Sequence, residues 1–94
     1  MRNYRIFETD EFVKTLDKLS PKDKKYIQNK LKTYVYPQLK NEPFWGKNIK
    51  KLKGYDPPTW RYRIGNFRLF FLVEKDEATV FILTIDDRKK AYKC

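Results

Sequence analysis

The sequence predicts a single α+β domain over residues 1–94. It is expected to have an N-terminal strand, followed by an antiparallel helical hairpin that packs on one face of a three- to four-stranded antiparallel sheet. Three observations predict this class. Apolar residues recur at helical spacing between residues 12 and 35, they alternate with charged residues from 61 onward, and no linker or repeat divides the chain. Hydrophobic residues make up 40% of the 94 residues, which is enough for one modest core.

The first two elements are expected to be a strand and a helix. Residues 2–8 alternate loosely, with Tyr4 and Ile6 on one face of the strand. A helix should follow, because the side chain of Thr9 or Asp10 can accept a hydrogen bond from its first free amide groups. The apolar residues of this helix recur at helical spacing, and they are Phe12, Leu16 and Leu19.

A second helix is expected from Ser20, which is followed by Pro21 and, three residues after the serine, by Asp23. A capping serine, a proline at the first helical position and an early carboxylate together favour a helix start. Proline cannot continue the hydrogen-bonding pattern of a helix, so this helix is expected to end near Pro37. Its apolar face consists of Ile27, Leu31, Tyr34 and Val35.

Residues 61–73, RYRIGNFRLFFLV, predict a β-hairpin with Gly65-Asn66 as its two-residue turn. The turn sets the register, so the expected cross-strand pairs are Ile64–Phe67, Arg63–Arg68, Tyr62–Leu69 and Arg61–Phe70. Before the hairpin, residues 40–60 are rich in proline and glycine and predict a loop with a short strand around Ile49 and Leu52. After it, the charged turn at 74–77 leads to the β-branched stretch ATVFILTI at 78–85, which suits a buried strand.

Strand alternation places Arg61, Arg63 and Arg68 on the face of the hairpin that points away from the helices, together with Phe70 and Leu72. Like charges directly opposite each other destabilise a sheet, by about 0.8 kcal/mol at a spacing of ~5 Å in water and by more where water is excluded. A bound phosphate would turn this repulsion into a shared clamp, so we interpret the face as an anion site. The alternative is that the arginine stems only cover apolar surface on an open sheet.

The charge of the chain favours a polyanionic partner. It carries 22 Lys and Arg against 12 Asp and Glu, which gives a net charge of +10. Nucleic acid, an anionic membrane and an acidic protein are the partner classes that such a charge fits. Four lysines before the hairpin could contact phosphate, although each taken alone is more simply a surface charge: Lys47, Lys50, Lys51 and Lys53.

Several classes of protein are not expected. No apolar run approaches the ~18 residues of a membrane helix, and the first ten residues have no apolar signal segment. The single cysteine, Cys94, cannot form a disulfide within the chain, so a cytoplasmic protein with no membrane association is expected. The sequence contains no histidine, no metal-ligand cluster and no phosphate-binding glycine loop, so no cofactor is expected.

Arg88 and Tyr92 follow the last predicted strand and are four residues apart. A phenol with a pKa of about 10 is a weak base, but neighbouring cations favour its ionised form. Since the chain has no histidine and no obvious glutamate on the arginine face, Tyr92 is the best available proton acceptor. The alternative is that Tyr92 is a packing residue in a C-terminal tail.

The order and spacing of these features resemble the RelE/ParE superfamily of bacterial and archaeal toxins, and in particular the RelE-type mRNA interferases. The resemblance covers nearly the whole chain. It rests on the helical hairpin, on KKLKG at 50–54, on WRYRIGNFRLFF at 60–71 and on IDDRKKAY at 85–92. The usual ending of the family, an arginine followed four residues later by a tyrosine, matches Arg88 and Tyr92.

The resemblance implies a metal-independent endoribonuclease, the toxin of a type II toxin–antitoxin system, that cleaves mRNA in the ribosomal A site. The ribose 2′-oxygen would attack the adjacent phosphate and leave a 2′,3′-cyclic phosphate. The implied catalytic residues are Arg61, Arg63, Arg68, Arg88 and Tyr92, and the implied RNA-binding residues are Lys47, Lys50, Lys51, Lys53 and Phe70. The implied partners are a cognate antitoxin, which forms a higher oligomer with the toxin, and the ribosome with its mRNA.

One departure from the family pattern leaves alternatives open. Many relatives have histidine just before the terminal arginine, where this chain has Asp87, which could pair with Arg88 or serve as a base. A ParE-like toxin that binds gyrase without cutting RNA is a second interpretation. A basic nucleic-acid-binding domain without catalysis is a third.

Overall fold

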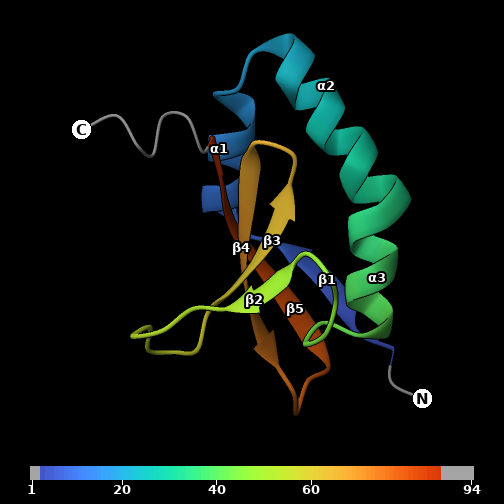
Figure 1. The fold of residues 1–94 in the computed structure, drawn as a ribbon, viewed down its shortest axis with the longest axis vertical. Coiled ribbons are helices and arrows are strands. Elements are labelled where there is room, and N and C mark those ends of the chain that lie inside the picture. Colours follow the sequence, from blue (N-terminus) through green and yellow to red (C-terminus); the bar gives the residue numbers. More distant parts are fainter. Residues whose placement is uncertain (1–2, 88–94) are drawn as a thin grey trace.

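The computed structural model describes residues 3–87, and within them five strands form one mixed sheet with helices against one face (Figure 1). The strands lie in the order β1-β5-β4-β3-β2, and all neighbours are antiparallel except β1 and β5. The expected α+β class is confirmed: four antiparallel strands are joined by the N-terminal strand, which pairs parallel with β5. The connection from β1 passes through the helices before the chain returns, which allows a parallel pairing. The strands are β1 (Arg5–Glu8), β2 (Ile49–Lys51), β3 (Trp60–Ile64), β4 (Phe67–Glu74) and β5 (Thr79–Asp87).

The first two helices, α1 (Asp10–Asp17) and α2 (Pro21–Lys30), begin where the capping residues predict. The hydroxyl of Thr9 accepts a hydrogen bond from the amide of Phe12 at 3.2 Å, so Thr9 rather than Asp10 is the cap of α1. The hydroxyl of Ser20 accepts one from the amide of Asp23 at 3.1 Å, and Pro21 opens α2. Both caps satisfy amide groups that have no partner inside the helix.

The helical segment does not end near Pro37, and that expectation is wrong. A π-helical turn, η1 (Leu31–Val35), leads into a further helix, α3 (Tyr36–Asn41). The amide of Tyr36 donates to the carbonyl of Leu31, five residues earlier, which is the wider spacing of a π-turn. Pro37 therefore sits in the first turn of a new α-helix, where its missing amide hydrogen has little cost.

The core lies between the helices and the inner face of the sheet. α3 contributes Leu39, which is fully buried, so the extension past Pro37 enlarges the core. No helix within residues 3–87 is long and apolar enough to cross a membrane. The buried apolar residues are Tyr4, Phe12, Leu16, Ile27, Leu31, Val35, Leu39, Tyr62, Ile64, Phe67, Leu69, Phe71, Val80, Ile82 and Ile85.

The hairpin of β3 and β4 has the predicted register. Arg63 lies opposite Arg68, and the three other expected pairs are also found. Gly65 has a φ of +57°, while Asn66 is not in the positive-φ region, which fits a turn with glycine at its first central position. A two-residue turn of this kind leaves the pairing of the arginines no freedom to slip.

β5 contains a bulge that the sequence analysis did not predict. Phe71 of β4 pairs with Ile82, but the preceding residue, Phe70, pairs with Thr84, so Leu83 has no counterpart on β4. The extra residue reverses the alternation of the strand from that point. As a result, Ile82 and Ile85 are both buried although they are three residues apart.

Two threonines of the first helical segment hold the bulge in place. The amide and the hydroxyl of Thr9 both donate to the carbonyl of Ile82, at 3.1 and 2.7 Å. The hydroxyl of Thr15 accepts a hydrogen bond from the amide of Ile85 at 3.2 Å and donates to the carbonyl of Phe12 at 2.9 Å. The backbone groups around the bulge are therefore paired with α1 and its cap.

Replacing Thr15 by valine tests this anchor. Thr15→Val keeps the shape of the side chain but leaves the partly buried amide of Ile85 without its acceptor. We expect the free energy of unfolding to fall by about 1–3 kcal/mol, measured by urea denaturation. Thr33→Val, at an exposed helical position, should change it by less than about 0.5 kcal/mol. Equal effects of the two substitutions would show that the hydrogen bond to the bulge contributes nothing.

Candidate nucleic-acid interface

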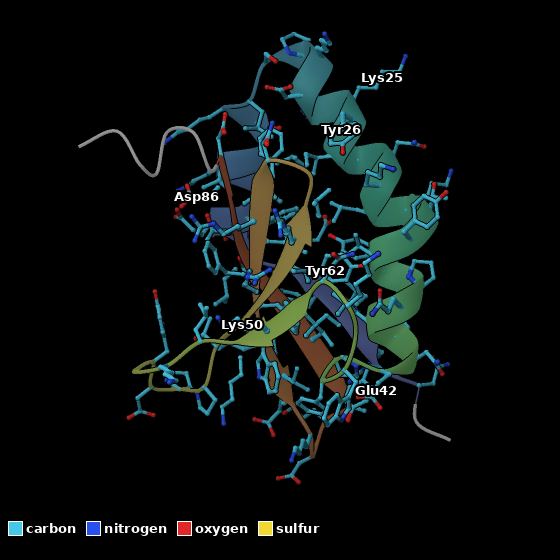
Figure 2. The ribbon with its side chains drawn as sticks, viewed as in Figure 1. Lys25, Tyr26, Glu42, Lys50, Tyr62 and Asp86 are labelled. Carbon is cyan, nitrogen blue, oxygen red and sulfur yellow. The ribbon has the colours of Figure 1, made fainter. Side chains whose placement is uncertain are left out.

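The sheet face turned away from the helices, which we call the outer face, carries the predicted arginines. Residues directly opposite on neighbouring strands share a face, so the register sorts the outer side chains into rows. In Figure 2, Tyr62 lies on the side of α2 and α3, whereas Lys50 and Asp86 lie on the side away from these two helices. The apolar row contains Phe7, Phe81 and Leu72, the mixed row contains Thr84, Phe70, Arg61 and Lys50, and the charged row contains Asp86, Arg68 and Arg63.

The two arginines of β3 are positioned by the residue that precedes β2. The carbonyl of Asn48 accepts a hydrogen bond from the amide of Arg63 at 2.9 Å and another from a guanidinium nitrogen, Nη1, of Arg61 at 3.4 Å. Arg61 and Arg68 are half-buried, and Arg63 is exposed. The three guanidinium groups therefore project from two paired strands rather than from a loop, which limits how far they can move apart.

Asp86 is the site residue that the sequence analysis missed. It lies directly opposite Arg68 on the outer face, beside the Arg63–Arg68 pair. The bulge at Leu83 places Asp86 on the outer face, because regular alternation from Ile82 would have placed this residue on the inner face. Local alternation gives no signal for this bulge, because Ile82, Leu83 and Ile85 stand in a stretch, ATVFILTI, that is apolar or β-branched throughout. Asp87, which was singled out instead, lies opposite Phe67, whose side chain belongs to the core.

The structure separates the four lysines. Lys50 lies opposite Arg61 and so shares the outer face with the arginines. Lys51 lies opposite Trp60 on the other face, with its Nζ 5.9 Å from the centre of the indole ring. Lys47 precedes β2 and Lys53 follows it, and both are exposed in loops. The role of these lysines in RNA binding stays a prediction, and Lys50 is the best placed of them.

The two remaining predicted catalytic residues, Arg88 and Tyr92, lie outside the described residues. β5 ends at Asp87, one residue after the position opposite Arg68. Arg88 is the next residue in the sequence. The roles of Arg88 and Tyr92 stay predictions.

Two described tyrosines are poor proton acceptors. Tyr62 is buried on the inner face and donates to Oε1 of Gln38 at 2.6 Å, and its burial raises the pKa of the phenol. Tyr36 donates to a carboxylate oxygen of Glu8 at 2.6 Å, and burial together with that hydrogen bond and the negative charge of Glu8 raises its pKa far above the ordinary value. Both phenols therefore stay protonated at neutral pH. Within residues 3–87, no cluster of acidic or cysteine side chains could hold a metal ion.

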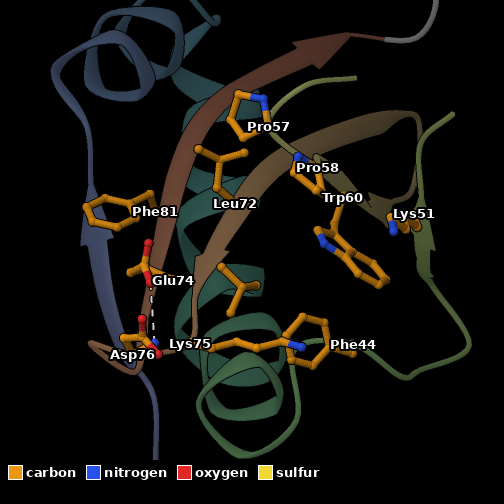
Figure 3. Close-up of a pocket in the computed structure, with 11 residues that line it drawn as sticks. Phe44, Lys51, Pro57, Pro58, Trp60, Leu72, Glu74, Lys75, Asp76 and Phe81 are labelled. Carbon is orange, nitrogen blue, oxygen red and sulfur yellow. Dashed lines mark hydrogen bonds between the residues drawn. The ribbon is translucent and has the colours of Figure 1, made fainter. Parts of the chain in front are cut away.

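A separate groove of about 600 Å³ opens at the far end of the sheet from the charged row (Figure 3). Leu72 and Phe81 of the apolar row form part of its wall, and Pro57 and Pro58 lie near Leu72. Phe7, with 54% of its surface exposed, packs edge-on against Phe81 at a ring distance of 5.6 Å. The outer face is thus cationic at one end and apolar at the other.

The chain is similar to known toxins along nearly its whole length. The sequence model of the family described as the ParE toxin of the type II toxin–antitoxin system parDE matches residues 6–92. A Methanocaldococcus jannaschii protein named RelE1 is 35% identical over 81 residues, which is 86% of either chain. The solved RelBE2 toxin–antitoxin complex of Mycobacterium tuberculosis contains a chain with a TM-score of 0.70 and 25% identity, covering 92% of this chain and 99% of that one. The RelB–RelE complex of Methanococcus jannaschii gives 0.68 and 26%, covering 92% and 94%.

The charged row makes a prediction about folding. Asp86→Asn removes the negative charge opposite Arg68, so we expect the free energy of unfolding to fall by about 0.2–1 kcal/mol. Arg63→Ala removes the repulsion with Arg68, so the free energy of unfolding should rise. Both effects should shrink as salt is added, because salt screens exposed charges. Chemical denaturation at low and high ionic strength measures them, with the exposed turn residue Glu77→Gln as the control. A destabilisation by Arg63→Ala that salt does not change would contradict this account of the row.

Proposed function

Since the chain belongs to the RelE/ParE family of toxins of type II toxin–antitoxin systems, we propose that it is a ribosome-dependent endoribonuclease that cleaves mRNA in the A site and so inhibits translation. The observation that carries the proposal is the pairing of Arg63 with Arg68 on the outer face, with Arg61 in the adjacent row. A sheet that holds like charges together gains from an anion between them. The proposed substrate implies action in the cytoplasm.

The proposed reaction needs charge stabilisation and proton transfer but no metal. The ribose 2′-oxygen attacks phosphorus and loses its proton, the bond from phosphorus to the 5′-oxygen breaks, and that oxygen gains a proton. Arg61, Arg63 and Arg68 would stabilise the extra negative charge on the phosphorane, an electrostatic contribution that is often the largest in catalysis. Arg88 would add a fourth positive charge to this stabilisation. Tyr92 would take the 2′-hydroxyl proton or orient the nucleotide.

A second candidate is a toxin that binds gyrase and cuts no RNA. The observation in its favour is that the matching family description is that of ParE toxins. A gyrase-binding toxin has no need of three clustered arginines on a sheet face, and for this reason we place the nuclease first. A basic nucleic-acid-binding domain without catalysis would need the arginines but would be indifferent to Tyr92.

The proposed partner in regulation is a cognate antitoxin. Two of the similar solved structures are toxin–antitoxin complexes. On this chain the apolar row and the adjoining groove offer a surface for apolar side chains, and the arginines beyond them offer one for carboxylates. We propose that the antitoxin covers Phe70 and Leu72, masks the arginines, and assembles with the toxin into a higher oligomer.

Salt dependence tests the phosphate contacts. Arg68→Ala should weaken the binding of single-stranded RNA and reduce the slope of log K against log salt by about 0.7, the amount expected for one lost phosphate contact. Arg5→Ala is the matched control, because Arg5 lies on β1, the edge strand farthest from the arginines of β3. Fluorescence anisotropy over a range of salt concentrations measures the slope. An unchanged slope in Arg68→Ala would return this arginine to a purely structural role.

Tyr92→Phe separates a nuclease from a binding protein. The substitution removes one oxygen, so cleavage of mRNA on ribosomes should fall by roughly 10²–10⁴-fold, the usual range for the loss of a general acid or base. RNA affinity should stay within a few-fold, because the arginines remain. Primer extension on mRNA from expressing cells measures the cleavage, with Tyr55→Phe, in an exposed loop, as the control. Full toxicity of Tyr92→Phe would make Tyr92 a packing residue, and gyrase inhibition without cuts in mRNA would favour the second candidate.

A further inference from the structure

We propose that a groove between the helices and the edge of β3 binds an unpaired RNA base, as a second RNA contact outside the outer face. The inference rests on the proposed function, in that it takes RNA to be the polyanion that the chain binds. The groove has a volume of about 410 Å³, within the range of roughly 300–1,000 Å³ typical of sites for small ligands. We call it the tyrosine groove, and its principal walls are Tyr26, Lys30, Tyr34, Gln38 and Arg63.

Two exposed aromatic side chains and a lysine define the helical wall. Tyr26 and Tyr34 are 41% and 59% exposed, so neither is needed to fill the core. Lys30 lies between them in the sequence, with its Nζ 5.8 Å from the centre of the Tyr26 ring and 4.9 Å from that of the Tyr34 ring. Aromatic rings beside cations are the elements with which proteins bind single-stranded nucleic acids, because every base can stack and every nucleotide carries a phosphate.

The charge of the groove favours an anion. Among residues 3–87, no acidic side chain lines it, and Lys30, whose Nζ lies beside both tyrosine rings, contributes a positive charge. A groove that served an acidic peptide would have the same charge, but two exposed phenol rings on an otherwise lysine-rich helix favour a ligand with flat faces of its own. An RNA base with its phosphate satisfies both requirements.

Arg63 connects the tyrosine groove to the outer face. It belongs to the charged row by its pairing with Arg68, and it also lines the groove at the edge of β3, where its amide donates to the carbonyl of Asn48. An RNA chain with one phosphate at the arginines can therefore pass around this edge and place a neighbouring base against Tyr34. The contact adds affinity without adding a group to the chemistry of cleavage.

The groove is formed in advance of any ligand. A Cβ atom at Gly65 would lie 2.9 Å from the hydroxyl of Tyr26, so this tyrosine rests against the tip of the hairpin. On the opposite side, the amide of Gln38 is held by its hydrogen bonds to Tyr62 and to the carbonyl of Trp45. Tyr26 is thus a wall, and Tyr34, the more exposed ring, is the surface on which a base stacks.

The test measures RNA binding directly. A fluorescently labelled single-stranded RNA of about eight nucleotides is titrated with the parent and with Tyr34→Ala, Tyr34→Phe and Tyr55→Ala. Tyr34→Ala should weaken binding by about 5- to 100-fold, and Tyr34→Phe should stay within about twofold, because the ring is kept. Tyr55 is 56% exposed, much like Tyr34, and Tyr55→Ala is expected to bind as the parent does. A fluorescent base analogue in the RNA should be quenched by the parent and by Tyr34→Phe but not by Tyr34→Ala.

Three results would overturn the proposal: parent-like binding by Tyr34→Ala, an equal loss in Tyr55→Ala, or no measurable binding of the RNA by the parent. If the first of these results is accompanied by loss of antitoxin binding in Tyr34→Ala, the groove is a protein-binding site instead. The ribosomal cleavage assay is scored separately. If the parent binds RNA through Tyr34 but cuts no mRNA, the groove proposal is supported and the nuclease proposal is rejected. If the parent cuts mRNA but its RNA affinity does not depend on Tyr34, the nuclease proposal is supported and the groove proposal is rejected.

Discussion

The bulge at Leu83 is the constraint on which the outer face depends. One extra residue in β5 changes which side chains of that strand face the helices, so that Ile85 is buried and Asp86 comes to lie opposite Arg68. A bulge frees backbone groups of the strand, and here the hydroxyl groups of Thr9 and Thr15 pair with them. The cap of α1 therefore also sets the charge pattern on the far side of the sheet.

The arginine pair is an unfavourable arrangement that the hairpin makes unavoidable. With glycine at the first position of a two-residue turn, Arg63 and Arg68 cannot avoid each other by a shift of register. Asp86, on β5, weakens the repulsion between Arg63 and Arg68, while Arg61 and Arg63 lie on the other side of Arg68, on β3. Such a pair favours a group with more than one negative charge, and the phosphorane of the proposed RNA cleavage would be such a group.

Local features were predictable from the sequence, and features set by tertiary packing were not. The helix caps and the hairpin register follow from a few adjacent residues, and the structure has them as expected. The π-turn before Pro37 could not be read from the sequence, because burial of Leu39 favours continuing the helix past the proline. The position of Asp86 depends on hydrogen bonds between residues about 70 positions apart, for which local alternation gives no sign. Arg88 and Tyr92, which complete the predicted catalytic set, lie beyond the described residues.

The short length of β2 has a consequence for how RNA could lie on the molecule. β2 pairs with only three residues of β3, and Asn48 adds a hydrogen bond to the amide of Arg63, so the edge of β3 next to α2 and η1 is uncovered after Arg63. A longer edge strand would have closed this side and separated the outer face from the helices. With the edge open, Arg63 can contact a phosphate whose neighbouring base lies against Tyr34. A base bound in this way would hold the RNA in place while the arginines contact the adjacent phosphate. Binding outside the reacting centre would then offset part of the entropic cost of orienting the reacting ribose.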